Sequence, residues 1–233
     1  MARVFNFAAG PSALPESVLA ECAEEMLDYR GCGMSVLEMS HRSSAYQQIF
    51  DETEATLRRI VDIPSDYKVL FLQGGATLQF AGIPMNLMAT GRAAYIVSGN
   101  FSKKAYLEAR KYGEAEVIAT SEWTNFDRVP SVVGVGELAE IYGYDYLYFC
   151  QNNTIFGTQY VEVPQVEGIP LVADMSSMIL SKPVDVTKYG CIYFGVQKNV
   201  APAGMAIAIV RDDLLGHAAD TVPTMMNYTT LLA

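Results

Sequence analysis

The pattern of hydrophobic and polar positions predicts helices that alternate with strands along most of the chain. After a first loop that contains Gly10, Pro11 and Pro15, apolar residues recur at the three- and four-residue spacing of amphipathic helices. This spacing predicts helices over residues 16–30, 45–60, 77–88 and 102–111. Short apolar runs between turn-forming residues predict strands over residues 68–73, 93–97, 117–119, 146–150, 171–173, 192–194 and 205–210.

Several of these strands are apolar on both faces, which is typical of a parallel sheet covered by helices. The alternation, without an internal repeat or a linker, favours an α/β fold built on a mostly parallel sheet. Ligands of such folds bind beyond the carboxyl ends of the strands, so the residues that follow each strand are candidates for a site. Small, hydroxyl, amide or charged residues follow five of the strands, at positions 73–77, 98–101, 151–154, 174 and 195–198.

The composition is that of a folded, acidic protein. Its 233 residues, 51% of them hydrophobic, suffice for one large domain or for one and a half. The net charge, 16 Lys and Arg minus 26 Asp and Glu, is −10, which disfavours nucleic acid and anionic membranes as partners. No apolar stretch approaches the roughly 20 residues of a transmembrane helix, and the first residues have no secretory pattern. We therefore expect a cytoplasmic protein that holds any anionic ligand with a few local groups.

The cysteines predict neither disulfides nor a metal site. Cys22, Cys32, Cys150 and Cys191 form no C-x-x-C pair and have apolar neighbours, which is typical of reduced, buried thiols. The chain has only 2 His residues, fewer than a zinc site built without cysteine pairs would need. We expect no bound metal.

Two interpretations are open for Gly74, Gly75, Ala76 and Thr77, which lie where a predicted strand meets a predicted helix. The backbone N–H groups at such a helix start can bind a phosphate. Alternatively, the segment is a tight turn in which Thr77 caps the helix. The chain has no P-loop sequence, G-x-x-x-x-G-K-[ST], so the phosphate interpretation depends on the residues nearby.

Residues 134–139, with the sequence GVGELA, fit the loose dinucleotide-binding pattern G-x-G-x-x-[GA]. Their context is unfavourable, because the preceding strand would be very short and no acidic residue follows at a strand end about 20 positions later. We therefore do not expect a nicotinamide dinucleotide to bind there.

Asp174 and Lys198 each follow an apolar strand, so a parallel sheet would bring them to one edge. Each alone could be an ordinary surface charge. Together they indicate pyridoxal phosphate (PLP) chemistry, in which a lysine amine forms a Schiff base and a carboxylate pairs with the cofactor's pyridinium nitrogen. The carboxylate keeps that nitrogen protonated, and the released lysine can move the proton from the substrate's Cα.

His41 and Arg42 lie in a predicted loop before the helix over residues 45–60. The simpler interpretation is a solvated loop. The alternative is a site for an anionic substrate, because a guanidinium matches the geometry of carboxylates and phosphates and a histidine adds a second donor.

Several motifs of the chain, in this order, resemble those of a known family, the phosphoserine aminotransferases, which are fold-type-I PLP enzymes of serine biosynthesis. The resemblance extends over nearly the whole chain. It is carried by NFAAGPSALP at 6–15, HRS at 41–43, QGGAT at 73–77, NNTIFGT at 152–158 and ADMSS at 173–177. The most specific part is IYFGVQKN at 192–199, followed by APAG at 201–204.

The resemblance implies roles for the residues that would surround the cofactor ring. Lys198 would form the Schiff base, and Asp174 would pair with the pyridinium nitrogen. Thr154 would hydrogen-bond the phenolic oxygen. Phe101 stands where the family usually stacks a tryptophan on the ring, so it would offer a smaller stacking face.

The resemblance also implies two groups of anion-binding residues. The cofactor phosphate would be bound by Gly75, Ala76, Gln197 and Ser176. His41 and Arg42 would bind the phosphate and carboxylate of the substrate, reaching across from the neighbouring subunit of a homodimer.

A fold and a domain organisation follow from the same resemblance. The fold would be the three-layer αβα large domain of fold-type-I PLP transferases. Residues 1–15 would belong to a small domain, and residues 16–233 would form the PLP-binding large domain. The matching sequence ends near Tyr228, whereas the family continues into a C-terminal small domain, so we expect that domain to be absent.

The implied reaction is a transamination that links phosphoserine and 2-oxoglutarate with 3-phosphohydroxypyruvate and glutamate. These four small molecules would be the substrates and products, and PLP the cofactor. Two alternatives stay open. The chain could be a truncated, catalytically silent PLP-binding fragment, or a related fold-type-I aminotransferase with a different substrate.

Overall fold

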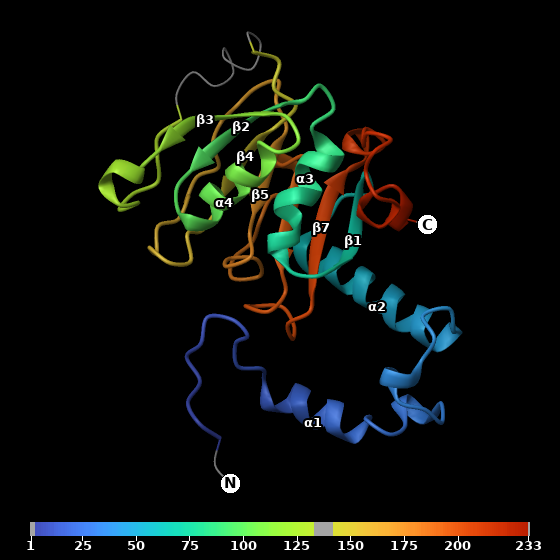
Figure 1. Cartoon of the computed structure of the whole chain (residues 1–233). Helices are drawn as coiled ribbons and strands as arrows, with labels where there is room; N and C mark the ends of the chain where they lie inside the picture. The colour runs from blue at the N-terminus through green and yellow to red at the C-terminus, as the bar shows by residue number, and fades with distance from the viewer. Residues whose placement is uncertain (1–2, 133–141, 233) are drawn as a thin grey trace.

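The computed structural model describes residues 3–132 and 142–232 and is built around a seven-stranded sheet (Figure 1). Its α-helices are α1 (Glu16–Glu24), α2 (Ser44–Val61), α3 (Gln79–Leu87) and α4 (Asn100–Ala109). Its strands are β1 (Tyr67–Gln73), β2 (Arg92–Val97), β3 (Glu114–Thr120), β4 (Leu147–Cys150), β5 (Leu171–Asp174), β6 (Cys191–Gly195) and β7 (Met205–Arg211). The dinucleotide-like sequence at 134–139 lies outside the described residues.

The sheet has the strand order β1-β7-β6-β5-β4-β2-β3, and all neighbours are parallel except those of β7. Strand β7 is antiparallel to both β6 and β1, because a short connection after β6 returns the chain along the same sheet. The prediction of a mostly parallel sheet is confirmed. As a result, β1, β2, β4, β5 and β6 all present their carboxyl ends at one edge.

Helices and irregular segments cover the two faces of the sheet and give three layers. One face of the sheet is covered by α3 and α4 (Figure 1). They pack on it through side chains such as Phe80, Ile83 and Ala105. On the other face, α2 packs through Leu57 and Val61, together with the irregular segment 175–189. Because both faces are covered, β4, β5 and β6 are buried along their whole length, which explains their continuous apolar sequences.

Strand β3 is longer than the sequence indicates. The predicted strand covers 117–119, whereas the observed one begins at Glu114, because β3 lies at an edge of the sheet where acidic residues remain solvated. Arg92 of the neighbouring strand forms ion pairs with Glu114 and Glu116, at 3.2 and 3.1 Å. The acidic side chains in the first half of β3 interrupt the hydrophobic pattern, so that pattern does not predict this half of the strand.

The amino-terminal segment departs most from expectation. The helix predicted over 16–30 ends at Glu24, and none of the residues of α1 is buried. Cys22 and Cys32 are exposed, so the prediction that all four cysteines are buried is wrong for these two and correct for Cys150 and Cys191. The physical reason is that no layer of the described chain packs on the apolar stripe of α1, and a short helix without packing is marginal.

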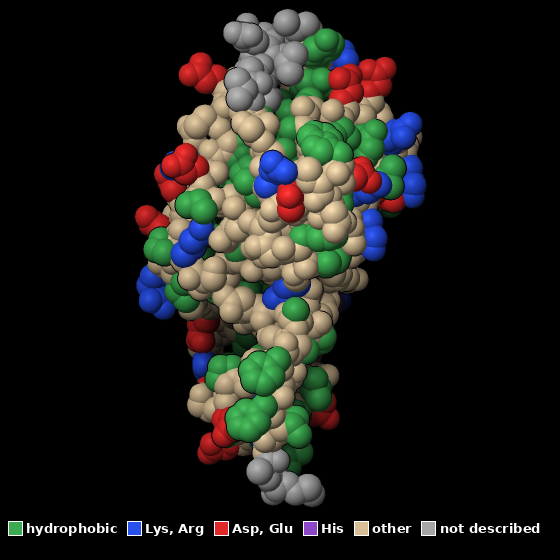
Figure 2. All heavy atoms as spheres, turned by 90° about the vertical axis from the view of Figure 1, so that its left-hand side faces the viewer, with side chains coloured by type: hydrophobic (Ala, Val, Ile, Leu, Met, Phe, Trp, Pro, Cys, Tyr) green, Lys and Arg blue, Asp and Glu red, His purple; other side chains and the backbone are tan. Residues whose placement is uncertain are grey.

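This segment carries uncovered apolar side chains. Of the described residues before α2, only Ser35 is buried. Val4, Phe5 and Phe7 are 86 to 92% exposed, and Figure 2 shows hydrophobic side chains gathered at the lower end of the molecule, where Figure 1 places the amino-terminal segment. An exposed apolar surface of this kind is typical of an interface with another chain or domain.

In the described ranges, no helix combines the length and the hydropathy that crossing a bilayer requires.

Substitutions in the buried central strands should destabilise the fold more than substitutions at its surface. Leu147 on β4 is fully buried, so Leu147→Ala should lower the free energy of unfolding by about 3 kcal/mol through lost burial and the cavity left behind. Leu107 on α4 is 48% exposed, and Leu107→Ala should change the same quantity by less than about 1 kcal/mol. Urea unfolding followed by circular dichroism measures both, and equal losses would contradict the assignment of the core.

Candidate active site

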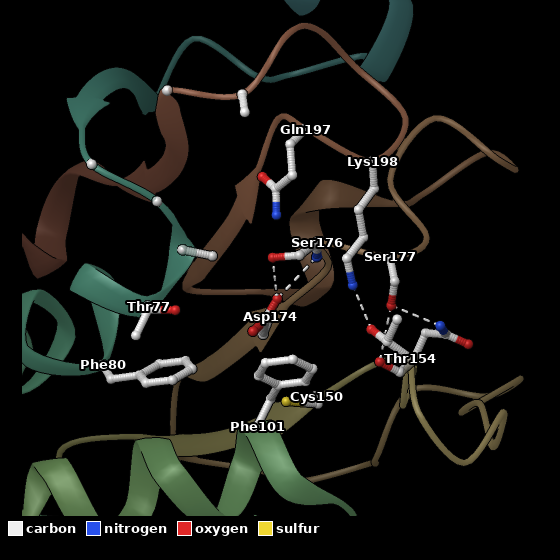
Figure 3. Close-up of a pocket in the computed structure, with 16 residues that line it drawn as sticks. Thr77, Phe80, Phe101, Cys150, Thr154, Asp174, Ser176, Ser177, Gln197 and Lys198 are labelled. Carbon is white, nitrogen blue, oxygen red and sulfur yellow. Dashed lines mark hydrogen bonds between the residues drawn. The ribbon is translucent and has the colours of Figure 1, made fainter. Parts of the chain in front are cut away.

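A pocket of about 270 Å³ lies at the edge of the sheet where the parallel strands end (Figure 3). This volume is close to the lower limit, about 300 Å³, for small-molecule sites. The pocket brings together residues that end or follow five different strands: Gly75, Ala76, Thr77, Phe101, Cys150, Asn152, Thr154, Asp174, Ser176, Ser177, Gln197 and Lys198. The prediction that polar strand ends converge on one site is confirmed.

Asp174 forms the floor of this pocket. It is the last residue of β5, and strand register places it between Cys150 on β4 and Tyr193 on β6. Its carboxylate accepts hydrogen bonds at Oδ1 from the backbone N–H and the hydroxyl of Ser176, at 2.9 and 2.6 Å, and at Oδ2 from the Tyr193 hydroxyl at 3.2 Å. Burial raises the pKa of Asp174, and these hydrogen bonds and the positive charge of Lys198 oppose the rise.

Lys198 enters the pocket from the loop that follows β6. Its Nζ donates a hydrogen bond to Thr154 Oγ1 at 2.5 Å and lies 5.6 Å from the centroid of the Phe101 ring. Burial lowers the pKa of the Lys198 amine, while the negative charge of Asp174 raises it. Because burial is the larger effect, the neutral, nucleophilic form of the Lys198 amine is populated at a lower pH than in an exposed lysine.

An opening suited to an anion lies between β1 and α3. Gly74 has a left-handed φ of +80°, which a glycine adopts without strain, and a short 3₁₀ turn over Ala76–Leu78 precedes α3. Among the described residues, no side chain caps this turn or the start of α3, so the interpretation of Thr77 as a helix cap is wrong. The first N–H groups of a helical turn have no partner within it. A Cβ on Gly75 would meet no atom within 4 Å, so the backbone here is open and suits a phosphate.

The side chains around the pocket approach from opposite sides. In Figure 3, Gln197 and Lys198 point into it from one side and Phe101 from the other, with Asp174 between them. Phe101 is the second residue of α4 and is half-buried, so its ring is available to a planar ligand. The hydroxyl hydrogen of Ser176 is donated to Asp174, so in this structure Ser176 holds the carboxylate.

The amino-terminal segment supports the loop that carries Lys198, which the sequence did not indicate. The Ser12 N–H donates to the Gln197 carbonyl at 3.1 Å, and the Ser12 hydroxyl donates to the Lys198 carbonyl. Gly10 packs so closely that a Cβ there would lie 3.0 Å from Lys198 Cγ. The backbone of residues 10–12 therefore helps to fix the direction in which Lys198 points.

The pocket thus combines a nucleophilic amine, a buried carboxylate, an aromatic face and an open helix start. Residues 4–226 match the family model described as Aminotransferase class-V. The chain belongs to the class-V aminotransferase family. Since this match covers nearly all of the described residues, it includes every strand end that lines the pocket.

Individual relatives agree with this assignment. The phosphoserine aminotransferase of Bacillus cereus is 53% identical over 231 residues, which cover 99% of this chain and 63% of the relative. A solved structure that concerns radiation damage of the Schiff base in phosphoserine aminotransferase has a TM-score of 0.91 at 42% identity, covering 99% of this chain and 63% of that one. PLP-bound phosphoserine aminotransferase from Trichomonas vaginalis has a TM-score of 0.91 at 36% identity, covering 98% and 67%.

The chain spans less than two thirds of the length of the curated relatives it matches, about 63% for Bacillus cereus. The predicted substrate residues His41 and Arg42 do not line the pocket of their own chain. Both are exposed in the loop before α2, whose first turn is capped by Ser43. All other predicted site residues line this pocket, and only His41 and Arg42 of that set lie elsewhere in the described chain.

Sequence reasoning missed two neighbours of Asp174. Cys150 was expected only as a buried thiol, yet it lines the pocket, and Tyr193 was not considered although it donates to the carboxylate. The missing information is strand register, since Cys150, Asp174 and Tyr193 are direct partners on adjacent strands and share a face. The register of strands that are joined by connections of some 16 to 20 residues, as β4, β5 and β6 are, has no local sequence signal.

Over the described ranges, no cluster of three or more His, Cys, Asp or Glu residues is arranged to hold a metal ion.

The balance of burial and charge at Lys198 predicts a pH dependence. In the chain without added ligands, acylation of Lys198 should have its midpoint below the ordinary lysine value of about 10.4, because burial favours the neutral amine. Asp174→Asn should lower that midpoint further, because it removes the negative charge that stabilises the ammonium. Competitive labelling followed by peptide mass spectrometry measures the midpoint, with exposed Lys182 as the internal reference. A midpoint that is the same with and without the Asp174 charge would contradict this account.

Proposed function

We propose that this chain is the PLP-binding large domain of a phosphoserine aminotransferase. The observation that carries the proposal is the convergence, in one pocket, of the buried Asp174 carboxylate, the Lys198 amine and the uncapped turn at Gly75. The reaction is the reversible transfer of an amino group that converts phosphoserine and 2-oxoglutarate to 3-phosphohydroxypyruvate and glutamate. The names of the relatives support phosphoserine as the amino donor.

The residues present fit PLP. Its phosphate matches the open N–H groups of Ala76 and Thr77, next to Gly75, where no side chain occupies the space. Gln197 lines the same pocket and is the other candidate donor to that phosphate. A protonated ring nitrogen matches the Asp174 carboxylate, which accepts hydrogen bonds from Ser176 and Tyr193.

When bound, PLP supplies a carbonyl carbon that reacts with amines and a pyridinium ring that accepts electrons from the substrate's Cα. Lys198 Nζ is the group that would hold the cofactor covalently and, once released, would take and return the proton at that Cα. Asp174 would keep the ring nitrogen protonated. Thr154, which already contacts Lys198 Nζ, would donate to the phenolic oxygen, and Phe101 would stack on the ring.

Substrate binding would need a second copy of the chain. His41 and Arg42 lie outside the pocket of their own chain, so they would serve the pocket of a partner in a homodimer, where Arg42 would pair with the substrate's anionic groups. The exposed Val4, Phe5 and Phe7 support an interface on this side of the molecule. Residues 1–15 would belong to a small domain and residues 16–233 to the large domain.

A cytoplasmic setting is part of the same proposal. All four cysteines are free thiols, and Cys150 and Cys191 are buried next to the pocket and in the sheet. Free thiols persist in a reducing compartment.

One observation favours a second candidate. Because the chain spans 63% of its Bacillus cereus relative and leaves His41 and Arg42 away from the pocket, it could bind PLP without turnover. A related aminotransferase with a different substrate is the third possibility. The three candidate functions share the cofactor site. They differ in whether the chain turns over a substrate and in which substrate it accepts.

A substrate test separates these candidates. The chain with PLP should develop a visible absorption band, and phosphoserine with 2-oxoglutarate should yield glutamate. Arg42→Ala should lower kcat/KM for phosphoserine by at least about tenfold and leave that for serine unchanged, because the lost contact is a charge-assisted hydrogen bond to the phosphate. Arg59→Ala, an exposed arginine at the end of α2, is the matched control and should have no effect.

The other outcomes are distinct. A band without glutamate would establish the silent fragment and refute turnover by this chain. Glutamate formed equally well from unphosphorylated serine would refute the phosphoserine assignment. If Arg42 acts across a dimer, activity should also fall on dilution below the dimer dissociation constant.

A further inference from the structure

Asp174 is the end of a chain of buried side chains that the proposed reaction has not used. The Tyr193 hydroxyl donates to Asp174 Oδ2 at 3.2 Å, and the Tyr148 hydroxyl lies 2.7 Å from the Tyr193 hydroxyl. The Cys150 thiol lies 3.7 Å from the Tyr148 hydroxyl. Tyr148 and Tyr193 are 1% and 0% exposed, so water does not compete for these hydrogen bonds.

The sheet itself builds this chain of contacts. Asp174 is the register partner of Tyr193 on β6 and of Cys150 on β4, and Tyr148 lies two residues before Cys150 on the same face. The ring of Tyr148 also stacks on that of Tyr95, with centroids 4.9 Å apart. The hydroxyl groups are therefore fixed by backbone pairing and packing, not by flexible loops.

The direction of the hydrogen bonds follows from the number of hydrogens. An ionised carboxylate only accepts, so the single hydroxyl hydrogen of Tyr193 is given to Asp174. The Tyr193 oxygen then accepts from Tyr148, and the Tyr148 oxygen accepts from the Cys150 thiol. If Asp174 were protonated at Oδ2 and donated to Tyr193, keeping the other contacts as hydrogen bonds would require Tyr193 to donate to Tyr148 and Tyr148 to donate to the Cys150 sulfur, which is a weak acceptor. The chain therefore favours the ionised carboxylate.

We propose that Tyr193 and Tyr148 are positioning residues that hold Asp174 ionised and correctly oriented for the pyridinium nitrogen of PLP. The part of this proposal that concerns PLP rests on the proposed function. The part that concerns the ionisation of Asp174 does not. Burial raises the pKa of Tyr193 and of Tyr148 well above the ordinary tyrosine value, so both keep their hydrogens at neutral pH. In the described chain, the titratable groups that interact with Asp174 are Tyr193, Tyr148, Cys150 and Lys198.

A second tyrosine pair provides a matched control. The hydroxyl groups of Tyr95 and Tyr146 are also 2.7 Å apart, on the same face of the sheet, and both residues are 1% exposed. This pair makes no hydrogen bond to Asp174 among the described residues. Tyr146→Phe therefore removes an equivalent buried hydroxyl without touching the carboxylate chain.

The test is the titration of Asp174 in the chain without PLP, by NMR of carboxyl-¹³C aspartate with the signal assigned through Asp174→Asn. Tyr193→Phe should raise the titration midpoint of Asp174, because it removes a donor that stabilises the charged form. Tyr148→Phe should raise it less, and Tyr146→Phe should leave it unchanged. An unchanged midpoint in Tyr193→Phe, or an equal rise in Tyr146→Phe, would overturn the proposal.

PLP affinity gives the second measurement. Tyr193→Phe should weaken PLP binding about tenfold, the effect of a hydrogen bond to a charged group, whereas Tyr146→Phe should change it by less than about twofold. Equal weakening by the two variants would contradict a specific role for Tyr193. If the unsubstituted chain fails to bind PLP, the proposed function is refuted, and the carboxyl titration still decides whether the tyrosines control Asp174.

Discussion

The burial of one carboxylate is the constraint on which the site depends. Asp174 ends a central strand at 7% exposure, where an unpaired charge would be strongly unfavourable. Ser176 and Tyr193 supply its hydrogen bonds, and Lys198 supplies the opposing charge. The same burial lowers the pKa of Lys198 and so favours a free amine. A single environment therefore favours both a buried anion at Asp174 and a nucleophilic amine at Lys198.

The sheet topology brings Asp174 and Lys198 together with the other groups of the candidate site. Because only β7 runs against the other strands, the carboxyl ends of β1, β4, β5 and β6 meet at one edge. Each end contributes one kind of group: open N–H donors, the Thr154 hydroxyl, the Asp174 carboxylate and the Lys198 amine. The amino-terminal loop then fixes the backbone of residues 197–198 through Ser12. Rigid strands set the distances, and one long-range loop contact sets the direction of the lysine.

The sequence predicted those features that depend on short-range patterns. The apolar strands and the polar residues after them were identified because each is encoded by neighbouring positions, and the family motifs marked Lys198 and Asp174. The end of α1 and the exposure of Cys22 and Cys32 were mispredicted, because each depends on which surface packs against the segment. Tyr193 was missed because its contact with Asp174 follows from strand register, which is determined by the whole sheet.

Lys198, beside Asp174 in the pocket, is the residue that we propose to hold PLP. Incubation of the chain with PLP, reduction with borohydride and peptide mass spectrometry test it most directly. We expect one phosphopyridoxyl group per chain, on Lys198, and its loss in Lys198→Ala. Labelling of another lysine instead would contradict the claim. The most informative such case is Lys104, whose Nζ is also near the Phe101 ring, 5.8 Å from its centroid.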